Sequence, residues 1–326
     1  MKIKRTRARR WLRILAVLVL IGVIAINLIA YRHAYAMLHF TSGGAKTDKA
    51  EKLTGGQKIK VLLCGVNLPR AHTDMPATNV GAAAKAVTID SPNGIKLGAW
   101  FCPCEASSPL VILFHGYGAE KSGLLREAQA FLEMKHSVLL VDFRGSGDSS
   151  ESYTTTGFRE ADDVAAAVRY AREHLSPSKV ILYGQSMGAS AVLRSSHYCG
   201  VQPDAIIVEA VFDRMLNTTR HRFEAMGVPS FPSAELLLFW GGQQFDFDAF
   251  SHNPVQYAAS VKCPILFLHG SADPSARIEE ARRVFDAIPG KKSFREFPGS
   301  RHEPSIVRFP KEWNETVRNF LNATEN

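Results

Sequence analysis

The sequence lacks the cysteine patterns of a zinc site and of a disulfide-rich protein. Its 326 residues contain five cysteines, with no Cys-x-x-Cys pair and no zinc-type histidine spacing. Even in an exported protein, an odd number leaves at least one thiol free. We therefore expect no bound metal, and we expect most cysteines to serve as small apolar side chains. The cysteines are Cys64, Cys102, Cys104, Cys199 and Cys263.

Most of the chain also lacks an excess of positive charge, although the net charge is +8. Seven basic residues and no acidic one lie in the first 13 positions, namely Lys2, Lys4, Arg5, Arg7, Arg9, Arg10 and Arg13. Taking these seven from the 39 basic residues leaves 32, against 31 acidic ones. No basic stripe remains to follow a phosphate backbone, so the composition argues against a nucleic-acid partner.

One long apolar run follows the basic segment. Ile14 to Ala30 is apolar except for Asn27, and Trp11 and Tyr31 flank it. This length approaches that needed to cross a bilayer, so we expect a transmembrane signal anchor at residues 14–31. Basic residues stay on the cytoplasmic side, which keeps residues 1–13 in the cytoplasm. The large domain would then lie in the periplasm of a bacterium, with the chain in the inner membrane.

A cleaved signal peptide is the alternative. Ala34-Tyr35-Ala36 has the small-x-small form of a cleavage site. Against cleavage, the apolar run is longer than the about 7 to 15 residues of a signal-peptide core, and Arg32 and His33 precede the site. The sequence favours the anchor.

The remainder divides into a linker and one large domain. Residues 32–57 are expected to be a linker, since Thr41 to Gly56 is rich in Gly, Lys and Thr without hydrophobic periodicity. Residues 58–326 are expected to form the domain, with a first strand at Ile59 to Leu63. The turn sequence Ser91-Pro92-Asn93-Gly94 predicts a hairpin of the runs 85–90 and 95–101.

From Leu110 onward, apolar strands alternate with helical segments. This alternation predicts a mostly parallel sheet covered by helices on both faces. The expected strands are 110–114, 138–141, 180–183, 205–208, 265–268 and 293–297, and the expected helices are 122–134, 158–174, 187–197, 275–287 and 305–321. Residues 213–261 are longer than a crossover needs, and such inserts are often functional lids.

One strand, turn and helix carry a nucleophile motif. Val180 to Tyr183 leads into Gly184-Gln185-Ser186-Met187-Gly188 and then into an apolar helix. In this placement, Gly-x-Ser-x-Gly predicts a sharp turn that exposes the Ser186 hydroxyl at the edge of the sheet. A serine needs an imidazole to take its proton and a carboxylate to orient that imidazole.

Asp273 and His302 follow the serine at the ends of later strands. Carboxyl ends of parallel strands meet at one sheet edge, so Ser186, His302 and Asp273 are expected to form a triad there. Asp213, after the preceding strand, stays an alternative acid. Among the later histidines, His302 alone follows the last strand. His115 precedes the serine, so we interpret it as structural.

Two backbone N–H groups are expected to bind the oxyanion. One belongs to Met187, beside the nucleophile at the start of a helix. The other belongs to Tyr117 in the loop His115-Gly116-Tyr117-Gly118, whose glycines let the backbone approach a substrate.

The chain from about Lys85 resembles bacterial α/β-hydrolases of the lysophospholipase-like and serine-aminopeptidase-like branch. The matching segments are the 115–118 loop, the Asp142 to Ser149 loop, the elbow at Ser186, His269 to Asp273 and Gly299 to His302. The resemblance implies the α/β-hydrolase fold and hydrolysis of an ester, thioester or amide without a cofactor. After Asp273, Pro274-Ser275-Ala276 departs from the valine-proline pair common in relatives, so the resemblance makes no prediction of the shape of this loop.

The insert suggests the substrate class. Its apolar residues, including Phe239, Phe247 and Phe250, either line an acyl pocket or pack into a core. We expect a small-molecule or lipid ester as substrate, with a peptide or amide next. A non-catalytic binding protein on a hydrolase scaffold stays open. The sequence makes no prediction of oligomeric state.

Overall fold

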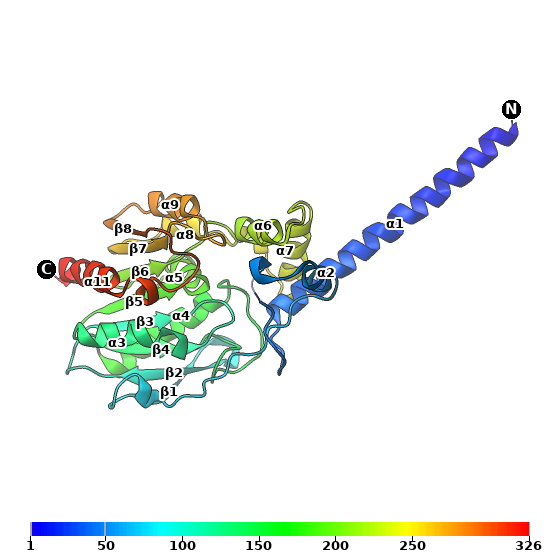
Figure 1. Cartoon of the computed structure of the whole chain (residues 1–326). Helices are drawn as coiled ribbons and strands as arrows, with labels where there is room; N and C mark the ends of the chain where they lie inside the picture. The colour runs from blue at the N-terminus through cyan, green and yellow to red at the C-terminus, as the bar shows by residue number, and fades with distance from the viewer. Residues whose placement is uncertain (1, 49, 326) are drawn as a thin grey trace.

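The computed structural model describes residues 2–48 and 50–325, and for residues 2–8, 51 and 325 only the course of the backbone. The basic side chains expected at residues 2–8 therefore lie outside the description. Figure 1 shows an α/β domain from which one long helix, α1 (Lys2–Leu38), projects at the end opposite the C-terminus.

One eight-stranded sheet forms the centre of the domain, in the order β1-β2-β4-β3-β5-β6-β7-β8. The hairpin of β1 and β2 is antiparallel, as predicted, β2 pairs antiparallel with β4, and the other pairs are parallel. The bounds are β1 (Lys85–Asp90), β2 (Lys96–Cys102), β3 (Leu110–Phe114), β4 (Ser137–Val141), β5 (Val180–Gln185), β6 (Ala205–Glu209), β7 (Ile265–Gly270) and β8 (Lys292–Phe297). The predicted strands after Leu110 are confirmed within one or two residues at their ends.

Helices cover both faces of the sheet, so its central strands are buried on both sides. Every residue of β3, β4 and β6 is buried, which explains their unbroken apolar runs. One face is covered by α4 (Glu160–Tyr170), α5 (Met187–Tyr198), α8 (Pro254–Ala258) and α9 (Ile278–Asp286). The other face is covered by α3 (Leu125–Glu133), α10 (Ser305–Arg308) and α11 (Pro310–Glu325).

The segment Ile59 to Leu63 is part of a helix, α2 (Gly55–Cys64), so the strand predicted there is wrong. Thr54 caps the helix: its hydroxyl accepts from the Gln57 N–H, and the Gln57 side chain accepts from the Thr54 N–H. This reciprocal capping box starts a helix and is visible in the sequence as Thr-x-x-Gln. Val61 is buried, whereas Ile59 and Leu63 are exposed.

The expected linker begins as helix. α1 continues beyond residue 31 to Leu38, and Ala34, Leu38 and Phe40 are buried in the domain. The backbone after the helix is also bonded, because the Phe40 N–H donates to Ser152 O and Leu38 O accepts from the Thr154 N–H, both over 2.8 Å. These contacts join α1 firmly to the domain, which the linker prediction did not anticipate.

The insert at residues 213–261 is helical, with α6 (Met215–Met226), α7 (Ser233–Gln244) and α8. α7 packs against the C-terminal part of α1. Figure 1 shows this contact at the base of the projecting helix. Within the described residues, Arg9–Leu38 of α1 is the one stretch long and apolar enough to cross a membrane.

All five cysteines are free thiols. Cys102 is buried, Cys64 is exposed, and the other three are intermediate. The expectation that most of them are buried apolar side chains is therefore wrong, because only Cys102 is buried.

Candidate active site

Ser186 sits in a strained turn between β5 and α5. Its φ of 53° and ψ of −110° lie outside the regions that non-glycine residues usually adopt. The two motif glycines allow this turn, because a Cβ on Gly184 would lie 2.6 Å from Gly188 O and one on Gly188 would lie 2.3 Å from Phe114 O. At these two glycines, the backbones of β5, α5 and β3 therefore lie too close together for any side chain to fit between them.

The structure brings the three predicted triad residues together in one hydrogen-bonded chain. Ser186 Oγ lies 3.0 Å from His302 Nε2, and His302 Nδ1 lies 2.6 Å from Asp273 Oδ2. With the proton on Nδ1, the imidazole donates to Asp273 and accepts from the Ser186 hydroxyl. The Asp273 side chain is fully buried, whereas that of His302 is one-quarter exposed.

Backbone contacts between two loops hold Asp273 beside His302. The Ala272 N–H donates to Ser300 O over 2.9 Å, and the Gly299 N–H donates to Ser271 Oγ over 2.8 Å. Gly270 makes the crossing possible, since a Cβ there would lie 2.5 Å from Ser300 O. The triad geometry therefore depends on a close approach between loops that are far apart along the chain.

Asp273 is held in its ionised form. Burial by itself would raise its pKa, but the hydrogen bond and charge of His302, together with the Ala276 N–H, lower it below the usual value. Asp273 Oδ1 accepts from the Ser275 and Ala276 N–H groups over 2.8 and 3.0 Å. The unusual Pro274-Ser275-Ala276 sequence thus forms a turn that binds the carboxylate.

Asp213, the alternative acid, is bonded elsewhere. Its carboxylate accepts from Asn217 Nδ2 over 3.0 Å and forms an ion pair with Arg283 over 2.9 Å. The structure therefore places Asp273, rather than Asp213, beside His302.

His115 binds only the backbone around it. Its Nε2 accepts from the Phe143 N–H over 3.1 Å, and its Nδ1 lies 2.8 Å from Gly116 O. Burial lowers the pKa of His115 below its usual value. These bonds hold the 115–118 loop against the loop after β4, which fits a structural role.

The loop expected to supply an oxyanion donor lies against the nucleophile. A Cβ on Gly116 would lie 3.7 Å from Ser186 Cβ. Met187 is the first residue of α5, where backbone N–H groups have no partner within the helix. The Tyr117 hydroxyl donates to Met37 O of α1 over 2.5 Å, so this loop is also tied to the apolar helix.

Glu209, at the end of β6, is a buried residue near the site that sequence reasoning did not single out. Its carboxylate accepts from the Tyr183 hydroxyl and from the Ser305 N–H, each over 2.5 Å. Its own backbone oxygen accepts from the Ser186 N–H over 2.8 Å. Glu209 therefore connects the nucleophile turn to the segment after His302. The sequence did contain a signal for this residue, because Glu209 is the one acidic residue at the end of an otherwise apolar strand.

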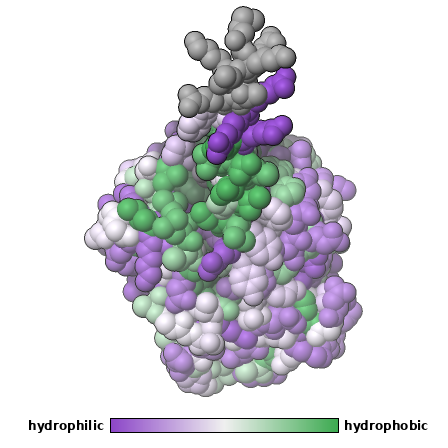
Figure 2. All heavy atoms as spheres, turned by 90° about the vertical axis from the view of Figure 1, so that its right-hand side faces the viewer, coloured by the Kyte–Doolittle hydropathy of each residue, from purple (hydrophilic) through white to green (hydrophobic). Residues whose placement is uncertain are grey.

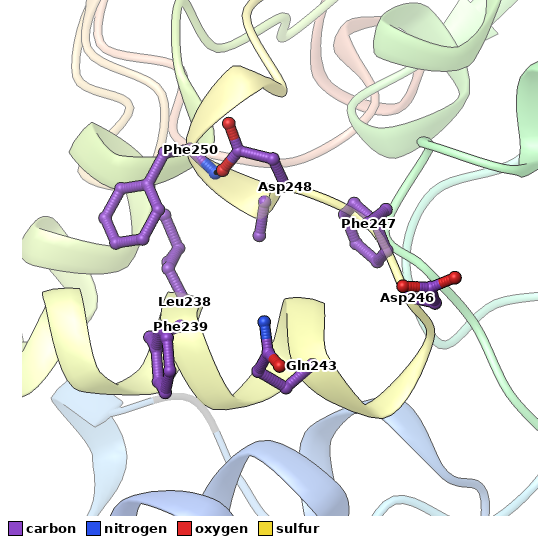
Figure 3. Close-up of a pocket in the computed structure, with 8 residues that line it drawn as sticks. Leu238, Phe239, Gln243, Asp246, Phe247, Asp248 and Phe250 are labelled. Atoms are coloured by element: carbon purple, nitrogen blue, oxygen red, sulfur yellow. Dashed lines mark hydrogen bonds between the residues drawn. The ribbon is translucent and has the colours of Figure 1, made fainter.

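The insert forms both a small core and a pocket. Leu237 is buried with Ala34, Phe223 and Ala234. A pocket of about 520 Å³ is lined in part by Phe239, Phe247 and Phe250. It lies between α7 and residues 246–250 (Figure 3). The triad residues are not among its lining. Within the described residues, no group of His, Cys, Asp and Glu side chains is placed to hold a metal ion.

Known proteins resemble this chain in sequence. A family model for the alpha/beta hydrolase fold matches residues 109–197, which run from β3 to α5. The uncharacterized protein YqkD of Bacillus subtilis is 24% identical over 239 residues, covering 72% of this chain and 78% of YqkD. The lysophosphatidylserine lipase ABHD12 of Macaca fascicularis is 26% identical over 247 residues, covering 69% of this chain and 59% of the lipase.

A solved structure resembles it as well. The esterase Pf2001 of Pyrococcus furiosus superposes with a TM-score of 0.66 at 21% identity, covering 79% of this chain and 99% of the esterase. The order of the strands, the sharp turn at Ser186 and the comparisons together define the class of the protein. The chain has the α/β-hydrolase fold. The predicted resemblance to α/β-hydrolases is thereby confirmed.

Proposed function

We propose that this protein is a membrane-anchored serine hydrolase that cleaves a carboxylic ester. The observation that carries the proposal is the continuous chain from Ser186 Oγ through His302 to Asp273, with distances of 3.0 and 2.6 Å. A strained nucleophile turn, an imidazole and a buried carboxylate are the parts that acyl transfer requires. The esterase and lipase among the similar proteins support hydrolase activity.

The reaction would proceed through an acyl-enzyme. His302 Nε2 takes the hydroxyl proton while Ser186 Oγ attacks the ester carbonyl carbon, and the resulting oxyanion binds the N–H groups of Met187 and Tyr117. The C–O bond to the alcohol then breaks, and His302 gives its proton to that oxygen. Water attacks the acyl-enzyme by the same steps, releasing the acid and restoring Ser186. Asp273 keeps its negative charge throughout and orients the imidazole.

A lipid ester is the substrate class we favour. The apolar helix α1 would hold the site beside a bilayer, and the insert places Phe239, Phe247 and Phe250 around a pocket. The similarity to a lysophosphatidylserine lipase points the same way. A thioester or amide would use the same triad, whereas an acyl-length series of esters tests the preference for a lipid. Constant kcat/KM across that series would contradict a lipid substrate.

Covalent labelling tests the catalytic proposal directly. A fluorophosphonate probe should label Ser186 in the full-length protein, and Ser186→Ala should abolish both labelling and ester hydrolysis, because the covalent step is lost. Ser190→Ala is a matched control, since Ser190 lies in α5, the helix after Ser186, and its hydroxyl is bonded to His252. Folded protein that resists the probe would favour a non-catalytic binding protein on this scaffold.

We further propose that the domain lies outside the cytoplasm. The basic residues before the apolar span would hold the N-terminus inside, and the span would then deliver the rest of the chain to the periplasm. A C-terminal alkaline phosphatase fusion should be active, whereas a fluorescent protein that matures only in the cytoplasm should stay dark. The opposite pair of signals would reverse the orientation.

A further inference from the structure

The position of α7 beside α1 fixes how the domain meets a membrane. Trp240 of α7 donates from its Nε1 to Asn27 Oδ1 over 3.1 Å. The same indole ring stacks edge-on with Tyr31 at 5.6 Å, and Gln244 donates to Tyr31 O over 3.2 Å. Asn27 and Tyr31 belong to the apolar part of α1, so α7 lies at the same depth as they do.

The length of the span sets that depth. From Trp11 to Tyr31 a helix rises about 30 Å, at about 1.5 Å per residue, which matches the hydrocarbon core of a bilayer. Tryptophan and tyrosine prefer the two membrane–water interfaces, which places Tyr31 at the domain side. Asn27 then lies about 6 Å deeper along the helix. A residue bonded to Asn27 is therefore below the surface of the lipid.

The surface around this contact is apolar. Figure 2 looks at the side from which α1 projects and shows hydrophobic surface gathered there, which includes the apolar side chains of α1 itself. The exposed large apolar residues of α2 and the insert are Ile59, Leu63, Phe231, Phe239 and Phe250, with Phe231 71% exposed. Such side chains are costly in water and favourable at a lipid interface.

We propose that the insert docks into the bilayer, with α7 partly immersed beside α1, so that the occupant of this apolar surface is lipid. The inference rests on the proposed membrane span and goes beyond it, because a spanning helix could equally hold a domain clear of the membrane. Phe239 packs against Trp240 at 5.1 Å and also lines the pocket in Figure 3. The pocket and the docked surface therefore share a residue.

The four tryptophans provide the test in the full-length protein. Trp100 and Trp313 are buried in the domain, Trp11 lies at the N-terminal end of the proposed span, and Trp240 lies at the proposed contact. The protein would be reconstituted in phosphatidylcholine vesicles that carry bromine near the headgroup end or near the tail end of the acyl chains. Subtracting the signal of Trp11→Phe/Trp240→Phe from that of Trp11→Phe isolates Trp240.

Trp240 fluorescence should be quenched by bromine near the headgroup end, and more weakly by bromine at the tail end. Trp100 and Trp313 should be unaffected. Quenching of Trp11 without quenching of Trp240 would show a domain held clear of the bilayer and overturn the proposal. Quenching of Trp240 that appears only when the protein is diluted in lipid would mean that a second copy of the protein covers the surface at higher density. That result would also overturn the proposal.

Activity is read separately in the same vesicles. Hydrolysis of a short water-soluble ester reports the proposed function, whereas quenching reports only position. An inactive protein with a quenched Trp240 would reject the proposed hydrolase activity and support the docking. An active protein with an unquenched Trp240 would support the activity and reject the docking.

Discussion

Asp213 and Asp273 lie after neighbouring strands, and their partners separate their roles. Arg283 and Asn217 satisfy Asp213. Asp273 receives two backbone N–H groups on one oxygen and His302 on the other. Because a carboxylate orients an imidazole by direct contact, Asp273 rather than Asp213 is the acid of the proposed triad.

Asp273→Asn should therefore lower kcat/KM by about 10⁴-fold, since the amide permits the wrong tautomer at Nδ1. Asp213→Asn is the matched control and should leave kcat/KM near that of the parent enzyme. Kinetics on a short ester would measure both. If the Asp213 variant lost activity and the Asp273 variant kept it, the assignment of the acid would be wrong.

At the scale of elements, the loop after β4 shows a structural use of charged residues. Lys121 is fully buried, with its ammonium 2.5 Å from Asp142 and 2.7 Å from Asp148. The Lys121 and Asp148 N–H groups also bind Asp142. The acids of this loop thus fold it beneath the 115–118 loop, which accounts for the Asp142 to Ser149 motif without a catalytic role.

Lys121→Met should destabilise the protein by about 3 to 5 kcal/mol, because it leaves the buried Asp142 charge without its partner. Lys96→Met is the control: its pair with Asp90 is exposed, so the change should stay within about 1 kcal/mol. Chemical unfolding of both variants in detergent gives the two free energies. Equal free energies of unfolding for the two variants would show that the buried Lys121–Asp142 pair stabilises the protein no more than the exposed pair does.

At the scale of the whole molecule, the apolar helix α1 and the domain form one folded unit. Leu38 and Phe40 are buried in the domain, and Tyr117 next to the nucleophile is bonded to Met37. We therefore propose that the folded domain begins before these contacts rather than at residue 58.

A protein truncated to residues 58–326 should be less stable than one truncated to 32–326. Burial of Leu38 and of Phe40 is worth about 1.5 to 3 kcal/mol each, and only the longer protein retains it. Thermal unfolding and short-ester turnover of the two proteins would measure the difference. Identical behaviour would mean that residues 32–57 act as a simple linker after all.

The sequence by itself determined the positions of the strands from Leu110 onward, the hairpin, the sharp turn at Ser186 and the apolar span. Those features follow from local periodicity, turn residues and the spacing of glycines, which are properties of neighbouring residues. The sequence also favoured Asp273 and His302 through chain order. It carried the capping box at Thr54 as well, although a short apolar run there was misread as a strand.

Tertiary structure alone decided which groups meet. The choice between Asp213 and Asp273 depended on Arg283, and Glu209 gained its place from Tyr183 and Ser305. The linker became part of the fold because α7, more than 190 residues later, packs against α1. Contacts of this kind join segments that are distant along the chain, and no local pattern records a hydrogen bond such as that between Trp240 and Asn27.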